Sequence, residues 1–86
     1  MPERYTVTER RRQYHGPQDK WYDRVAICVD DTVRNIRMHT YSLFEDEWRD
    51  GFAARCDFRR RCAERYAAWC NRHPGSNCER SKGKVA

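Results

Sequence analysis

The cysteines and histidines are the residues of this chain that are best suited to metal binding. Cys70, His73 and Cys78 follow one another at a spacing of x2 and x4, which brings three zinc-type ligands close together in sequence. A structural zinc site takes four ligands. Cys62 lies about 12 Å from Cys70 along a continuous helix, so both thiols cannot hold one ion. No paired CxxC motif is present. We therefore expect no metal site and no cofactor.

The five cysteines also do not have the pattern of a disulfide scaffold. Their number is odd, and Cys56 and Cys62 would stand about 9 Å apart along a helix, too far for a bond. The start of the chain shows no apolar signal segment, and no run of about 18 apolar residues predicts a membrane span. We expect reduced thiols and a cytoplasmic protein without membrane contact.

A thiol beside a histidine is the one arrangement here that could act as a nucleophile. Cys28 and His39 fall in neighbouring predicted strands, and a thiolate activated by histidine is a recurrent catalytic pair. No residue pattern supplies an oxyanion hole or a pocket. The sequence therefore predicts a protein that is not an enzyme.

Two segments of the chain have the periodicity of regular structure. Apolar residues between Ser42 and Arg72 recur on one side of a helix. Ser42 and Glu45 have the spacing of a capping box, and the helix would end before Pro74. Gly51 costs about 1 kcal/mol within a helix and predicts a possible bend there. Before the helix, apolar residues alternate in three predicted strands, at about 4–10, 21–30 and 34–41.

These elements predict an α+β domain over residues 1–73, with a three-stranded antiparallel sheet packed on one long C-terminal helix. The order of three strands followed by a helix is similar to that of the arm-binding domain of phage integrases, in element order only. We expect a flexible polar tail at 74–86. The large helix residues are expected to anchor the core or a dimer interface, namely Trp48, Phe52, Tyr66 and Trp69.

The sheet face opposite the helix, the open face, is the strongest candidate for a binding surface. Alternation assigns it basic and aromatic side chains, namely Arg4, Thr6, Thr8, Arg10, Tyr22, Arg24, Cys28, Arg37, His39 and Tyr41. Such a surface suits nucleic acid, through stacking and phosphate contacts, and equally a protein interface. An ordinary solvated sheet face is the third interpretation.

The charge is unevenly distributed along the chain. The net charge is +5, and residues 51–86 carry nine basic and three acidic side chains. Arg55 and Arg59 fall within the apolar side of the predicted helix, either extending to solvent from its edge or meeting an acidic partner. The basic half of the helix and the open face together form the predicted binding site, comprising Arg24, Arg37, His39, Tyr41, Arg60, Arg61 and Arg65.

Size, mixed charge and the lack of motifs point to a small binding protein. This profile resembles that of accessory proteins of phages and mobile elements, anti-CRISPR proteins among them. The resemblance implies an inhibitor that occupies a surface of a host protein or nucleoprotein complex. The alternative is a module that binds DNA or RNA directly through the basic aromatic sheet face. A homodimer is possible for a chain whose core is this small.

Overall fold

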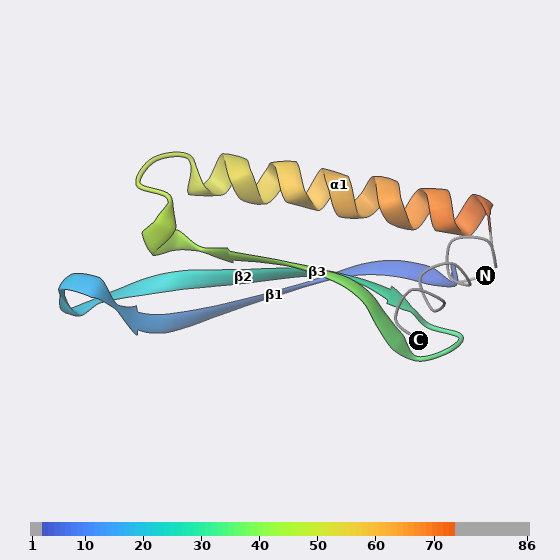
Figure 1. The fold of residues 1–86 in the computed structure, drawn as a ribbon, viewed down its shortest axis with the longest axis horizontal. Helices are drawn as coiled ribbons and strands as arrows, with labels where there is room; N and C mark the ends of the chain where they lie inside the picture. Colours follow the sequence, from blue (N-terminus) through green and yellow to red (C-terminus); the bar gives the residue numbers. More distant parts are fainter. Residues whose placement is uncertain (1–2, 74–86) are drawn as a thin grey trace, which may run out of the picture.

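The computed structural model describes residues 3–73, so the predicted tail at 74–86 lies outside the described residues. Three antiparallel strands form a sheet in the order β1-β2-β3, and one helix runs along a single face of it (Figure 1). The predicted α+β class is confirmed. The elements are β1 (Tyr5–Gly16), the short 3₁₀ turn η1 (Pro17–Asp19), β2 (Lys20–Asp31), β3 (Ile36–Phe44), a second 3₁₀ turn η2 (Glu45–Glu47) and α1 (Phe52–Arg72).

The core lies between β2 and α1. Val25, Ile27 and Val29 alternate along β2 and point at the helix, and none of them is accessible to solvent. Burying a side chain of this size stabilises a fold by about 1.5–3 kcal/mol. The helix meets them with small side chains, so its axis can lie close to the sheet. These buried helix residues are Cys56, Ala63, Ala67 and Cys70.

Polar contacts fix the first strand and the β2–β3 turn in place. Asn71, near the end of α1, accepts a hydrogen bond from the Tyr5 amide and donates one to the Tyr5 carbonyl, each at 3.0 Å. Asp31 is completely buried and lies between two guanidinium groups, 2.9 Å from Arg4 and 2.8 Å from Arg34. The Asn71 bonds attach the start of β1 to the helix, and the Asp31 ion pairs attach it to the β2–β3 turn.

The predicted start of the helix at Ser42 is wrong by ten residues. Ser42 pairs with Ala26 and belongs to β3, and the helix begins only after Gly51. Gly51 has a φ of 88°, in the left-handed region that glycine enters without strain. A capping box is worth about 1 kcal/mol. The cross-strand pairing and burial of Leu43 outweigh it.

The first strand is longer than predicted. β1 runs to Gly16 instead of ending at Arg10, and it pairs with β2 along its whole length, from Tyr5 opposite Asp31 to Gly16 opposite Lys20. The sequence does not predict the second half of this strand, because its charged residues leave neither face apolar. This extension of the hairpin lies beyond the start of the helix in Figure 1.

A bulge in β3 reverses the predicted faces of two site residues. Asp30 lies opposite Arg37 and Val29 lies opposite His39, so Met38 is an extra residue in the ladder. The sequence predicts an irregularity closer to the turn, near Val33. As a result His39 and Tyr41 face the helix, and the expectation that they lie on the open face is wrong.

Of the four aromatic residues predicted to anchor the core or a dimer interface, the two tryptophans lie outside the core. Trp69 is 39% exposed and stacks on His73, so its predicted core role is wrong. Trp48 precedes the helix and is half-buried under the guanidinium of Arg55. Phe52 and Tyr66 pack against the edge of the core.

Candidate functional site

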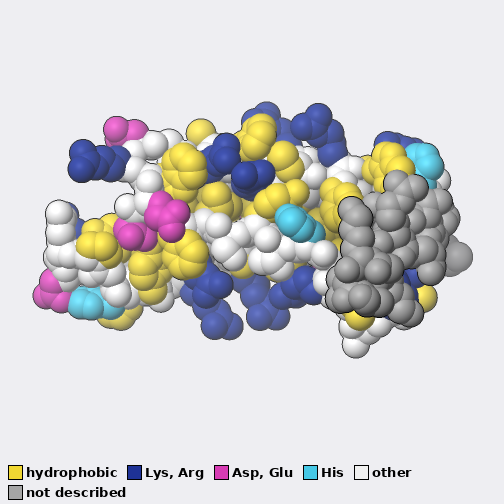
Figure 2. Space-filling view, viewed as in Figure 1, with side chains coloured by type: hydrophobic (Ala, Val, Ile, Leu, Met, Phe, Trp, Pro, Cys, Tyr) yellow, Lys and Arg dark blue, Asp and Glu magenta, His cyan; other side chains and the backbone are white. Residues whose placement is uncertain are grey.

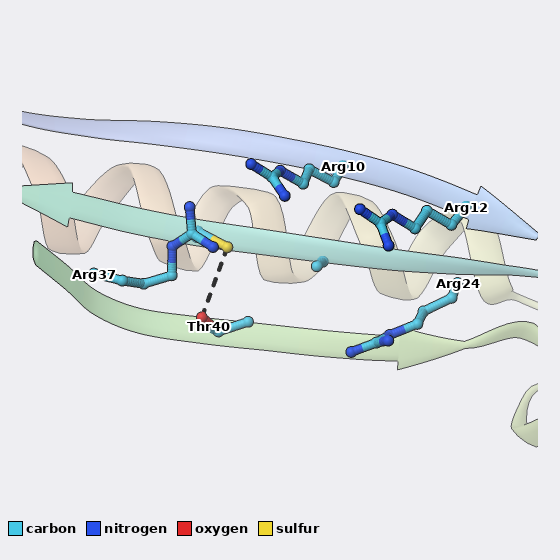
Figure 3. A pocket seen from close by; sticks show the side chains of 7 residues that line it. Arg10, Arg12, Arg24, Arg37 and Thr40 are labelled. Carbon is cyan, nitrogen blue, oxygen red and sulfur yellow. Dashed lines mark hydrogen bonds between the residues drawn. The ribbon is translucent and has the colours of Figure 1, made fainter.

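A shallow hollow occupies the middle of the open face. Its volume is about 220 Å³, and small side chains of the central strand form its floor. Figure 3 shows Arg10 and Arg12 extending from β1, Arg24 from β2 and Arg37 from β3 around this floor. The hollow exists because these long side chains surround short ones. The full lining is Arg10, Arg12, Arg24, Ala26, Cys28, Arg37 and Thr40.

Most of the positive charge in this hollow lacks a counter-charge. Arg37 pairs with Asp30 at 2.9 Å, and the carboxylate holds the pKa of Arg37 above its usual range. Within residues 3–73, Arg10, Arg12 and Arg24 have no carboxylate within ion-pairing distance. The hollow is therefore an electropositive surface without an acidic rim on the β1 side.

Two of these arginines stand directly opposite each other. Arg12 pairs with Arg24 in the β1–β2 ladder, and Arg10 pairs with Ala26. Like charges at opposite positions of an antiparallel pair destabilise the sheet. An anion bound between them would remove that repulsion, so the arrangement favours a negatively charged ligand.

Aromatic rings extend the open face beyond the hollow. Tyr14 lies 5.9 Å from Tyr22 and 5.7 Å from Phe44, measured between ring centroids, and Arg24 lies over the Phe44 ring. The Tyr14 hydroxyl donates a hydrogen bond to the Asp46 carboxylate, and the Tyr22 hydroxyl donates to the Pro17 carbonyl. The rings thus form a fixed apolar end next to the arginines.

The predicted thiol–histidine pair does not come together. Cys28 is buried in the floor of the hollow, where it accepts a hydrogen bond from the Thr40 hydroxyl at 3.6 Å. His39 lies on the other face of the sheet and contacts the rings of Tyr41 and Tyr66. The two groups are separated by the sheet and cannot act as a nucleophile and its base.

Among the described cysteines, Cys28, Cys56 and Cys62 are free thiols. Within residues 3–73 no group of three or more potential ligands is placed to hold a metal ion. The candidate set of Cys70, His73 and Cys78 includes a residue outside the described part of the chain. Burial raises the pKa of the Cys56 thiol, which makes this thiol a poor nucleophile at neutral pH.

The seven predicted site residues divide between two surfaces. Arg24 and Arg37 lie in the hollow, as expected. Arg60 is on the helix side, where it bonds Glu9 at 2.7 Å and Asp57 at 2.5 Å. The remaining residues are His39 and Tyr41, which face the helix, and Arg61 and Arg65, which are exposed on α1.

Sequence reasoning missed one arginine of the hollow. Arg12 lies beyond the predicted end of the first strand, although Arg10 was placed on the open face. The signal was present as an alternation of Thr6, Thr8, Arg10 and Arg12 on one side of an extended chain. Continuing this alternation from Arg10 to Arg12 would have placed Arg12 on the open face.

The helix side of the molecule carries a different mixture of side chains from the open face. Figure 2 shows basic side chains scattered among hydrophobic ones over the helix, and others along the lower border of the sheet. Phe58, 42% exposed, lies on the outer helix surface next to Arg61 and Arg65. Arg55 and Arg59 each lie over aromatic rings, with Phe58 shared between them.

Comparison of the chain with protein-family models, curated proteins and solved structures found no match. In the described part of the chain, α1 is too polar to cross a membrane. The class of protein is therefore defined by its fold and surface: a small α+β domain with an electropositive open sheet face.

Proposed function

We propose that this protein is a non-catalytic nucleic-acid-binding module that holds the phosphate backbone on the open face of its sheet. The observation that carries the proposal is the opposed pair of Arg12 and Arg24, which with Arg10 surrounds the hollow and lacks a carboxylate partner among residues 3–73. Guanidinium groups bind phosphate through two parallel hydrogen bonds.

The shape of the open face supports a polymer more than a small ligand. Small-molecule sites are usually enclosed clefts of about 300–1,000 Å³ lined mostly by apolar groups. Here the hollow is smaller, shallow and bordered by arginines from all three strands. The adjacent rings of Tyr14, Tyr22 and Phe44 add a surface on which a base could stack.

A second candidate function rests on the outer surface of α1. Exposed Phe58 next to Arg61 and Arg65 combines the residue types that are enriched in protein interfaces. This surface supports the role of a phage-type inhibitor that occupies a host protein complex in the cytoplasm. Nucleic acid is the better-supported ligand, because Arg12 and Arg24 in the hollow stand opposite each other without a carboxylate partner among residues 3–73.

The salt dependence of binding tests the proposal. Affinity for a fluorescent DNA duplex, measured by anisotropy between about 50 and 300 mM NaCl, should fall with a log–log slope of about −0.9 per phosphate neutralised. Three arginines without partners predict a slope of about −3. No binding at the lowest salt concentration, to the duplex or to a single strand, would refute the proposal.

A further inference from the structure

We propose that two copies of this chain pair antiparallel through the outer edges of their β3 strands, forming a continuous six-stranded sheet. β3 is an edge strand, and in the described part of the chain only β2 pairs with it. Its outer backbone N–H and C=O groups are therefore available as a template for another strand.

The two edges of the sheet differ in how well they are protected. β1 carries four charged side chains in succession, Glu9 to Arg12, which oppose pairing with another strand. β3 has none from Met38 to Phe44, and no proline. Beyond the bulge at Met38, the six residues from His39 to Phe44 form a regular edge without Asp, Glu, Lys, Arg or proline. An edge of this kind can pair with another chain, whereas β1 has charges that oppose such pairing.

The helix leaves space for a second copy beside β3. α1 packs on β1 and β2, so the helix side of β3 is only partly covered and Tyr41 is half-buried. In a joined sheet the two helix axes would be about 19 Å apart, four strand spacings. Packed helices need only about 8–10 Å, so the two helices do not collide.

The edge is self-complementary about Tyr41. When Tyr41 lies opposite its own copy, Thr40 faces Ser42 on the open face and His39 faces Leu43 on the helix face. The hydroxyls of Thr40 and Ser42 meet, and the two Tyr41 rings meet, which are favourable cross-strand pairs. This match with itself is the reason to assign the edge to a second copy of the chain.

One side chain opposes the arrangement. The guanidinium of Arg59 lies 5.2 Å from the centre of its own Tyr41 ring, so two such groups would approach near the dyad. They would lie in the solvent-filled groove between the helices, where water and salt screen like charges. The backbone hydrogen bonds of the paired segment outnumber this single repulsive contact.

Pairing would also enlarge the site of the proposed function. The two hollows would lie on the same face, about 14 Å apart across three strand spacings. This consequence rests on the proposed function, whereas the pairing itself does not. The mass of the protein without nucleic acid therefore tests the pairing separately.

Sedimentation equilibrium of the full chain, between about 1 and 100 μM, measures the pairing directly. We expect twice the chain mass of 10.4 kDa at the highest concentration. Thr40→Lys with Ser42→Lys places lysine opposite lysine twice and should weaken dimerisation at least about 100-fold, because like charges directly opposite each other repel.

The matched control changes the same two positions but places glutamate instead of lysine at Ser42. Thr40→Lys with Ser42→Glu places lysine opposite glutamate twice in the same register, so its dimer should be within about tenfold of the wild-type affinity. Circular dichroism establishes that both variants fold. A wild-type chain that stays a monomer at 100 μM would overturn the proposal, as would equal dissociation of the two variants. If β3 instead receives a strand from another protein, the isolated chain will be monomeric.

Discussion

Replacing Arg10, Arg12 and Arg24 together by alanine is expected to weaken duplex binding at least about 100-fold at 50 mM salt. Each guanidinium that neutralises a phosphate releases counterions, and this release dominates affinity at low salt. The slope of log affinity against log salt should decrease by almost 3. Titration by fluorescence anisotropy measures both quantities for the wild type and the variant.

The fold should survive these three changes. The side chains extend into solvent from the open face, and removing the opposed pair of Arg12 and Arg24 also removes a repulsion. The matched control replaces Arg61, Arg65 and Arg72, which are exposed on α1, and lowers the net charge by the same amount. The proposed site is wrong if this control loses as much affinity as the hollow variant.

Replacing Asp31 by alanine is expected to reduce the free energy of unfolding by about 3 kcal/mol. The carboxylate is completely buried and accepts hydrogen bonds from Arg4, Arg34 and the Val33 amide. Removing one partner of a buried ion pair costs about 3–5 kcal/mol, because charges remain without compensation. The lower value of this range applies to Asp31, since both of its arginine partners are partly exposed. Urea unfolding at pH 7 measures the loss.

The same carboxylate makes stability dependent on pH in a defined direction. Hydrogen bonds from Arg4 and Arg34 hold the pKa of Asp31 far below its usual range. A depressed native pKa contributes stability above the unfolded value, near 3.9, and this contribution is lost as the pH falls toward the native pKa. Stability should therefore decrease from about pH 5 downward.

Asp31→Asn is the matched control for this pH dependence. It keeps the size of the side chain but cannot titrate, so its unfolding free energy should change less between pH 5 and pH 3 than that of the wild type. Some acid dependence should remain, because a hydrogen bond from Arg60 also lowers the pKa of Glu9. Equal acid dependence in the two proteins would contradict the role assigned to Asp31.

The central strand and the fold class could be predicted because burial leaves a clear pattern. Val25, Ile27 and Val29 alternate with smaller or polar residues, and a sheet with one apolar face needs a helix to cover it. The start of the helix could not be predicted in this way. The segment around Ser42 has a helical periodicity and a cap, and only pairing with Ala26, a residue distant in sequence, makes it a strand.

The candidate site was predictable in part. Simple alternation placed Arg10, Arg24 and Arg37 on the open face, where the structure has them. It misplaced His39 and Tyr41, because the single extra residue at Met38 reverses every later side chain of the strand. The position of a bulge depends on the partner strand, which local patterns do not specify.

Chemical-shift mapping with a DNA duplex tests the central claim most directly. In ¹H–¹⁵N spectra of the wild-type chain, the arginine Nε–H signals of Arg10, Arg12 and Arg24 should shift together with the amides of β1 and β2 around them. Signals of Phe58 and Arg61 on the outer helix surface should stay in place. Shifts confined to α1, with those three arginines unchanged, would contradict the assignment of the open face as the binding surface.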